Sequence, residues 1–175
     1  SQAEKFFYMN DTIHLRAIEP EDLGFLYEIE NDPSIWSVGT PTAPYSHYAL
    51  KQYLENQPQD LFQTKQLRMI IEREGKSVGI LDLFNYNAND GRAEVGISIL
   101  KSERGKGIAT QALKKLEQHA RRLLNLHQLY ALVSASANLS SSRVFEKSGY
   151  KNIATLPQWH FINGSFEDIS VFQLF

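Results

Sequence analysis

The feature that most constrains the fold is a strand, a basic glycine-rich turn and a helix that follow one another between residues 93 and 124. Apolar residues alternate through 93–99, which predicts a strand, and they recur every fourth residue through 108–124, which predicts an amphipathic helix. A helix N-terminus carries free backbone N–H groups and the positive end of the helix dipole. The turn at 101–107 therefore predicts a phosphate-binding site.

The residues of this turn fit a pyrophosphate. Gly105 and Gly107 have no Cβ, so an anion can approach their main chain closely, and Arg104 and Lys106 add positive charge. Two familiar phosphate motifs are excluded. The spacing of a P-loop is absent, and a dinucleotide fingerprint would need a glycine at Thr110.

Length and composition indicate one soluble domain spanning residues 1–175. The net charge of −2 argues against nucleic acid as the main partner, and no apolar run is long enough to cross a membrane. We therefore expect no nucleic acid, no membrane and a cytoplasmic location. The absence of cysteine excludes disulfides, thiolate metal sites and an acyl-cysteine intermediate, and the five scattered histidines lead us to expect no bound metal.

The hydrophobic pattern predicts an α/β fold with a mixed central sheet of about six to seven strands, flanked by helices on both faces. Strands are predicted at 13–18, 66–73, 77–86, 93–99, 128–133, 150–156 and 166–174. Helices are predicted after Pro20, at about 47–55, at 108–124 and from about 138 to 147.

Two segments carry a resemblance to a known family. The pattern Arg-x-x-Gly-x-Ala at Arg104, Gly107 and Ala109, directly after a strand with a glutamate, resembles the acetyl-CoA pyrophosphate loop of the GNAT superfamily of N-acetyltransferases. The segment 138–150 is similar to a second signature of that superfamily, Asn-x-x-Ser-x-x-Val, a hydrophobic residue, then Glu-Lys-x-Gly-Phe/Tyr. The closing stretch 159–168 resembles the end of spermidine and diamine acetyltransferases. Together with Asn31-Asp32-Pro33 and the loop around Trp36, this resemblance implies a place near the spermidine and ribosomal-protein acetyltransferase branches without choosing between them.

This resemblance implies a GNAT-like domain that transfers an acetyl group directly from acetyl-CoA to a primary amine, either a small molecule such as a polyamine or a protein N-terminus. Main-chain N–H groups of the strand at 97–99 would orient the thioester and hold the oxyanion. The resemblance implies that acetyl-CoA contacts Ile97, Ser98, Ile99, Arg104, Gly105, Lys106, Gly107, Ile108, Ala109, Thr110, Asn138 and Ser141.

The chemistry requires a base, because an amine with a pKa of about 10 arrives protonated. Glu94 is the candidate base, since the family often places a glutamate there; a water chain, or a purely structural role for Glu94, is the alternative. Phe145 stands where some branches have a tyrosine that protonates the leaving thiolate. Ser141 then becomes the candidate proton donor or conduit.

The acceptor side is predicted from residues with two interpretations each. Glu28 belongs to an acidic helix end that either attracts a cationic amine or is simply solvated. Trp36 and Tyr45 either border the acceptor or pin their loop to the core, and His160 is either near the acceptor or structural.

Two other functions stay open at this point. Because Phe145 replaces the phenol, the chain could be an inactive acyl-CoA-binding sensor or scaffold, and transfer of a longer acyl group is a weaker option. A homodimer is expected because it is common among relatives.

Overall fold

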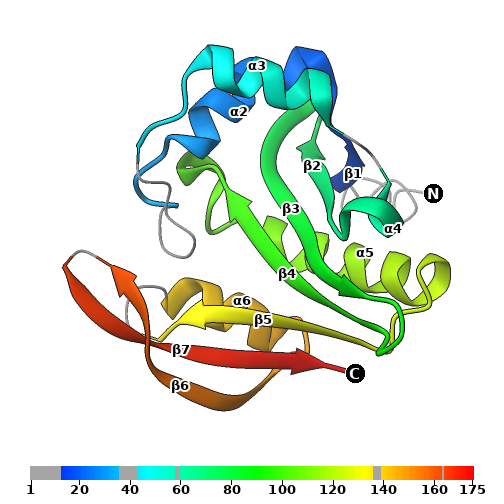
Figure 1. Cartoon of the computed structure of the whole chain (residues 1–175), viewed down its shortest axis with the longest axis vertical. Coiled ribbons are helices and arrows are strands. Elements are labelled where there is room, and N and C mark those ends of the chain that lie inside the picture. Colours follow the sequence, from blue (N-terminus) through cyan, green and yellow to red (C-terminus); the bar gives the residue numbers. More distant parts are fainter. Residues whose placement is uncertain (1–12, 36–42, 58–59, 136–138, 163) are drawn as a thin grey trace, which may run out of the picture.

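The computed structural model describes residues 13–35, 43–57, 60–135, 139–162 and 164–175. Its strands form one seven-stranded sheet in the order β1-β2-β3-β4-β5-β7-β6, with helices on both faces (Figure 1). The strands are β1 (Ile13–Ala17), β2 (Leu67–Arg73), β3 (Lys76–Asn87), β4 (Arg92–Ile99), β5 (Gln128–Ser134), β6 (Lys151–Ile162) and β7 (Ser165–Leu174). The helices are α2 (Leu23–Glu30), α3 (His47–Asn56), α4 (Leu61–Thr64), α5 (Ile108–Leu123) and α6 (Leu139–Lys147), with short turns η1 (Pro20–Asp22) and η2 (Lys101–Glu103). The predicted mixed α/β fold is confirmed.

One pairing in this sheet is parallel and short. β4 and β5 pair only through Arg92–Gln128, Ala93–Leu129 and Glu94–Tyr130, whereas every other neighbouring pair is antiparallel. Beyond Glu94 the two strands diverge, as Figure 1 shows. The second half of β4 therefore has a free edge on the side of β5.

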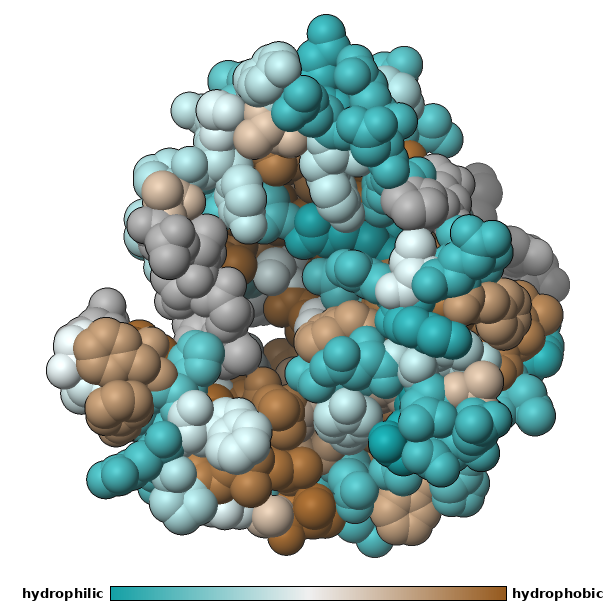
Figure 2. Space-filling view, viewed as in Figure 1, coloured by the Kyte–Doolittle hydropathy of each residue, from teal (hydrophilic) through white to brown (hydrophobic). Residues whose placement is uncertain are grey.

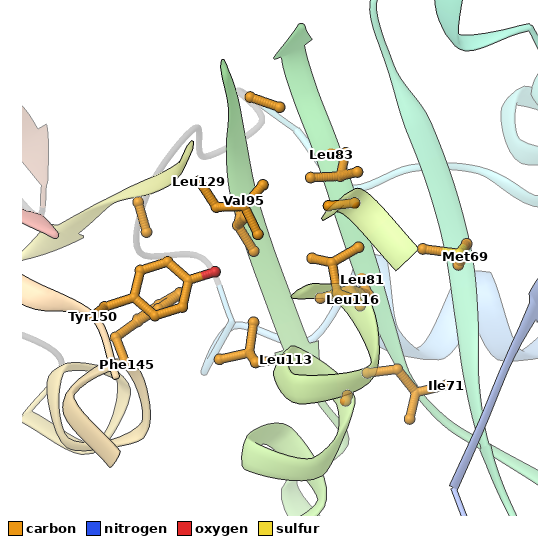
Figure 3. Packing of buried hydrophobic residues seen from close by; sticks show 14 of the residues in the cluster. Met69, Ile71, Leu81, Leu83, Val95, Leu113, Leu116, Leu129, Phe145 and Tyr150 are labelled. Atoms are coloured by element: carbon orange, nitrogen blue, oxygen red, sulfur yellow. The ribbon is translucent and has the colours of Figure 1, made fainter. Parts of the chain in front are cut away.

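Strand register separates the residues of the sheet between two faces. Leu83 and Val95 form one cross-strand pair whose side chains pack beneath α5, in a cluster that also holds Leu113 and Leu116 (Figure 3). The neighbouring pairs, Asp82 with Gly96 and Phe84 with Glu94, point to the other face because side chains alternate along a strand. That face is covered in part by α2 and α3, whose Leu26, Ile29 and Leu50 share a buried cluster with Ile70 and Ile80 of the sheet.

The helix after the glycine turn forms as the sequence predicts. Gly107, with φ of 76°, precedes the first residue of α5. The apolar stripe of α5 is buried, whereas Lys114 and Arg122 on the opposite side are exposed. No helix in the described parts of the chain is long and apolar enough to cross a membrane.

β6 extends further than predicted. The sequence predicts this strand over 150–156, but the strand continues through Pro157 to Ile162. β6 is an edge strand, where a missing N–H costs no ladder hydrogen bond, and its pairing with β7 is irregular between Leu156 and His160. The prediction of this strand end was therefore wrong.

An ion pair ties the first strand to the first helical turn. Arg16 on β1 donates two hydrogen bonds of 2.8 Å to the two carboxylate oxygens of Asp22, which is buried, and a third of 2.8 Å to Glu72 on β2. The hydrogen bonds from Arg16 hold the pKa of Asp22 below its usual range, against the opposing effect of burial. This pair fixes where α2 starts.

We predict that Arg16→Met lowers the free energy of unfolding by about 2–3 kcal/mol, because it leaves a buried carboxylate unpaired. The pKa of Asp22 is lowered in the folded chain, so the pair stabilises above the unfolded pKa and its contribution is lost as pH falls through the folded pKa. Denaturant unfolding should thus show the variant approaching the wild type on acidification. Arg121→Met, which breaks an exposed helical pair with Glu117, should change stability by less than about 0.5 kcal/mol; equal losses in both variants would contradict this role.

Candidate functional site

A pocket of about 450 Å³ lies where the end of β4, the glycine turn, the first turn of α5 and α6 meet. Figure 2 shows the molecule hollowed near its centre, between the diverging ends of β4 and β5. The lining residues are Ser34, Ile35, Ile97, Ser98, Ile99, Glu103, Arg104, Gly105, Gly107, Ile108, Ala109, Thr110, Ser141, Arg143, Val144 and Lys147.

The glycine turn gives this pocket an anion-binding wall. Gly105 and Gly107 both have φ of 76°, in the left-handed region that glycine adopts without strain. A Cβ at either position would meet no atom within 4 Å, so glycine is required here by the backbone conformation rather than by crowding. The N–H groups of the first turn of α5, at 108–110, have no partner within the helix and lie along the pocket.

Arg104 joins this wall to the chain that follows α2. Its Nε donates to the carbonyl oxygen of Ile99 at 3.1 Å, and its terminal nitrogen donates to Oγ of Ser34 at 3.0 Å. The Ser34 hydroxyl in turn donates to Asp32 at 2.7 Å. Lys106 behaves differently: it pairs with Glu103 at 2.9 Å and does not line the pocket.

Glu94 lies three residues before Ile97 on β4, about 10 Å away along the strand. It is only 8% exposed and receives a hydrogen bond of 3.1 Å from the side-chain amide of Asn85 on β3. Burial raises the pKa of Glu94, and the hydrogen bond from Asn85 and the nearby Tyr130 hydroxyl on β5 oppose the rise.

A second group of charges lies on the same face of the sheet as Glu94. Arg68 on β2 forms ion pairs with Asp82 on β3, at 2.9 Å, and with Glu30 at the end of α2. Burial raises the pKa of Asp82, and Arg68 counteracts the rise. Because Asp82 is paired with Gly96 in register, this cluster flanks the middle of β4.

Of the residues predicted for the acceptor side, the three that the structure describes, Glu28, Tyr45 and His160, do not line the pocket. Glu28 is exposed on α2, and the main chain of Tyr45 exchanges two hydrogen bonds with the side chain of Asn31. His160 lies on β6, where its buried Nε2 has no partner among the described residues. Trp36 and Asn138 lie outside the described residues.

Phe145 belongs to the core. Its ring is 3% exposed and packs against Tyr150 and Phe172, with ring centroids 5.1 and 5.9 Å apart (Figure 3 shows the first contact). Ser141, one turn earlier on α6, does line the pocket.

The sequence interpretation missed several lining residues. Arg143 and Lys147 stand four residues apart on α6, so they lie near each other on its surface, and this basic spacing could have suggested a phosphate contact. Ser34 and Ile35 reach the pocket only through the tertiary fold, and no local pattern marks them.

Comparison with known proteins identifies the family of the chain. A family model described as an acetyltransferase (GNAT) domain matches residues 12–151. The chain is similar to spermidine N(1)-acetyltransferase of Vibrio cholerae, at 28% identity over 162 residues, which are 92% of this chain and 91% of the relative. It also resembles the crystal structure of spermidine N-acetyltransferase from V. cholerae in complex with CoA and spermine, with a TM-score of 0.80 and 25% identity over 94% of this chain and 96% of the other.

The fold extends to more distant structures. RimL, a ribosomal L7/L12 alpha-N-protein acetyltransferase solved in complex with coenzyme A, aligns with a TM-score of 0.83 over 95% of each chain, at 19% identity, which is a likeness of fold alone. With the family model matched over most of its length, the chain belongs to the GNAT family of acetyltransferases, enzymes that transfer an acetyl group from acetyl-CoA to an amine.

Proposed function

We propose that the pocket binds acetyl-CoA and that Glu94 deprotonates a polyamine or another small primary amine bound on the face of the sheet that Glu94 occupies. The observation that carries this proposal is the free edge of β4. Residues 97–99 line the pocket just beyond the point where pairing with β5 stops, next to an anion-binding helix N-terminus.

The diphosphate of the donor fits the glycine turn. Main-chain N–H groups at 105–110 would hold its oxygens, with Arg104 near the end of β4 and Arg143 and Lys147 on α6 supplying positive charge. The arm that carries the thioester contains amide groups, which can bond to unpaired main-chain groups at the free edge of β4. The thioester then reaches the part of β4 nearest to Glu94.

The reaction follows from this arrangement. Glu94 accepts a proton from the bound ammonium, and the neutral nitrogen attacks the thioester carbonyl, whose oxygen is held by main-chain N–H groups of β4. The carbon–sulfur bond then breaks, the attacking nitrogen releases its second proton to solvent to give the amide, and the thiolate takes a proton from solvent or by way of Ser141. Ser141 lines the pocket, which fits this role.

A cationic acceptor agrees with the relatives that act on spermidine. Glu28, Trp36, Tyr45 and His160 stay predictions for this side of the site. Cytoplasmic location likewise stays a prediction.

We infer that a second copy of the chain covers the hairpin of β6 and β7. Trp159, Phe161 and Phe166 on this hairpin are each at least 60% exposed, and Figure 2 shows apolar side chains gathered at its tip. β6 is also an edge strand, whose unpaired main-chain groups favour association.

Turnover should require an amine acceptor and the Glu94 carboxylate. Purified protein with acetyl-CoA should release free thiol in the presence of polyamines, with little release on aminoglycosides, free amino acids or peptide N-termini. Glu94→Gln should lower kcat/KM by about 10²- to 10⁴-fold at neutral pH, because the base is lost. Glu55→Gln, an exposed change on α3, is the control; binding of CoA without turnover on any amine would contradict the proposed function.

Binding of acetyl-CoA should depend on Arg104. Arg104→Glu should raise the KM for acetyl-CoA by about 10- to 100-fold, because it replaces a cation beside the diphosphate with an anion. Lys114→Glu makes the same charge change on the exposed side of α5 and should leave that KM unchanged. An unchanged KM in Arg104→Glu would show that the diphosphate binds elsewhere.

Self-association of the chain should depend on the exposed aromatic residues of the β6–β7 hairpin. Light scattering coupled to gel filtration should give the mass of a dimer or a larger assembly for the wild type. A Phe161→Asp, Phe166→Asp double variant should give the mass of a monomer, because burying two carboxylates in an apolar interface is unfavourable. Phe62→Asp, at a comparably exposed phenylalanine on α4, should keep the wild-type mass; a monomeric wild type would contradict self-association.

A further inference from the structure

We propose that Asn85 and Tyr130 are positioning residues that hold the Glu94 carboxylate in place, and that a β-bulge in β3 exists at this point to bring Asn85 to it. This inference rests on the proposed function, in which Glu94 is the base. It extends that function to two side chains, from the strands on either side of β4, that do not line the donor pocket.

The bulge explains how Asn85 reaches Glu94. Phe84 pairs with Glu94 and Asn87 pairs with Arg92, so two residues of β3, Asn85 and Tyr86, face a single residue of β4. In a regular ladder the residue after Phe84 would point to the opposite face, toward α5. A bulge inserts one residue and redirects the side chains beside it, which lets the Asn85 amide reach Glu94 at 3.1 Å.

The backbone at this position is unusual. Asn85 has φ of 49°, in the left-handed region that few residues other than glycine, asparagine and aspartate adopt. Strain of this kind persists only when the surrounding structure imposes it. Here the bulge is anchored on its other side by Tyr86, whose side chain is buried and whose N–H donates to the carbonyl oxygen of Lys65 at 3.2 Å.

Tyr130 completes the contact from the opposite strand. It is the register partner of Glu94 and forms the last pair before β4 and β5 diverge. Its hydroxyl lies near the Glu94 carboxylate, whose pKa it lowers, and near the Asn85 amide. Three adjacent strands thus each place one polar group at the apex of the divergence.

The charged groups around Glu94 interact with other residues. Arg92, two residues earlier on β4, lowers the pKa of Tyr130, whereas Asp82 on β3 forms an ion pair with Arg68. Gln173 on β7, the register partner of Tyr130, is uncharged. Burial raises the pKa of Glu94, and the hydrogen bond from Asn85 and the nearby Tyr130 hydroxyl oppose the rise. Loss of either group should therefore favour the protonated carboxyl, which cannot act as a base.

The test uses variants that preserve the backbone. Asn85→Gly removes the amide while tolerating positive φ, and Asn85→Asp keeps the shape while placing a second carboxylate beside Glu94. Tyr130→Phe removes the hydroxyl. Asn125, which also has positive φ (51°) but lies after α5, provides the matched Asn125→Gly and Asn125→Asp controls, and Tyr150→Phe is the control for a buried phenol.

Two readouts are measured. The first is the titration of the Glu94 side-chain carboxyl by carbon-13 NMR in the protein without substrates, with the signal assigned by its loss in Glu94→Gln. The second is the pH dependence of kcat/KM with a polyamine. We expect the Glu94 titration and the acidic limb of the profile to move upward by about one pH unit in Asn85→Gly and Tyr130→Phe, and further in Asn85→Asp, with the KM for acetyl-CoA unchanged.

The outcomes separate this inference from the proposed function. A titration of Glu94 in Asn85→Gly and Tyr130→Phe that matches the Asn125→Gly and Tyr150→Phe controls would overturn the positioning role, even where Glu94→Gln abolishes turnover. Full activity in Glu94→Gln would instead overturn the assignment of Glu94 as base, while the NMR titration would still report whether Asn85 and Tyr130 hold its carboxylate.

Discussion

The early end of the pairing between β4 and β5 is the constraint on which the site depends. A strand inside a sheet uses its main-chain N–H and C=O groups on both sides, but β4 beyond Glu94 has a strand partner only in β3. Main-chain groups that lose a strand partner must bond to water or to a ligand. The sheet thereby offers an extended substrate the same hydrogen bonds that a neighbouring strand would have used, and the glycine turn at the end of β4 sets where the phosphates of that substrate begin.

The alternation of side chains along β4 gives the two faces of this strand different roles. Val95 and its neighbours on the α5 side pack in the hydrophobic core, and this packing holds that face of the strand in place. Glu94 points to the other face, where α2 and α3 cover only part of the sheet. A donor at the edge of β4 and an acceptor over its face can therefore be bound together, as direct transfer between two substrates requires.

Local patterns could predict the scaffold but not its irregularities. The strand, turn and helix from residue 93 to 124 follow from periodicity and two glycines, and the structure contains them as expected. The bulge at Asn85 could not be predicted, because Phe84, Asn85 and Tyr86 carry no signal that distinguishes a bulged strand from a regular one. The contact between Ser34 and Arg104 joins residues 70 positions apart, so it depends on how α2 packs on the sheet rather than on any short segment. The continuation of β6 through Pro157 could not be predicted, because a proline is tolerated in a strand at the edge of a sheet and only the topology shows that β6 is at an edge.

The core position of Phe145 indicates which proton transfer this site must control. Where the resemblance to other branches would place a phenol, this chain has a ring packed between Tyr150 and Phe172, so the position contributes aromatic packing rather than a proton. A thiol has a reference pKa of about 8.5 and leaves as a thiolate without a strong acid, whereas an alkylamine with a pKa of about 10 cannot attack until it is deprotonated. The demanding step is therefore removal of the amine proton, and the chain places its buried carboxylate, with a hydrogen bond from Asn85 and the Tyr130 hydroxyl nearby, at the point where β4 and β5 diverge.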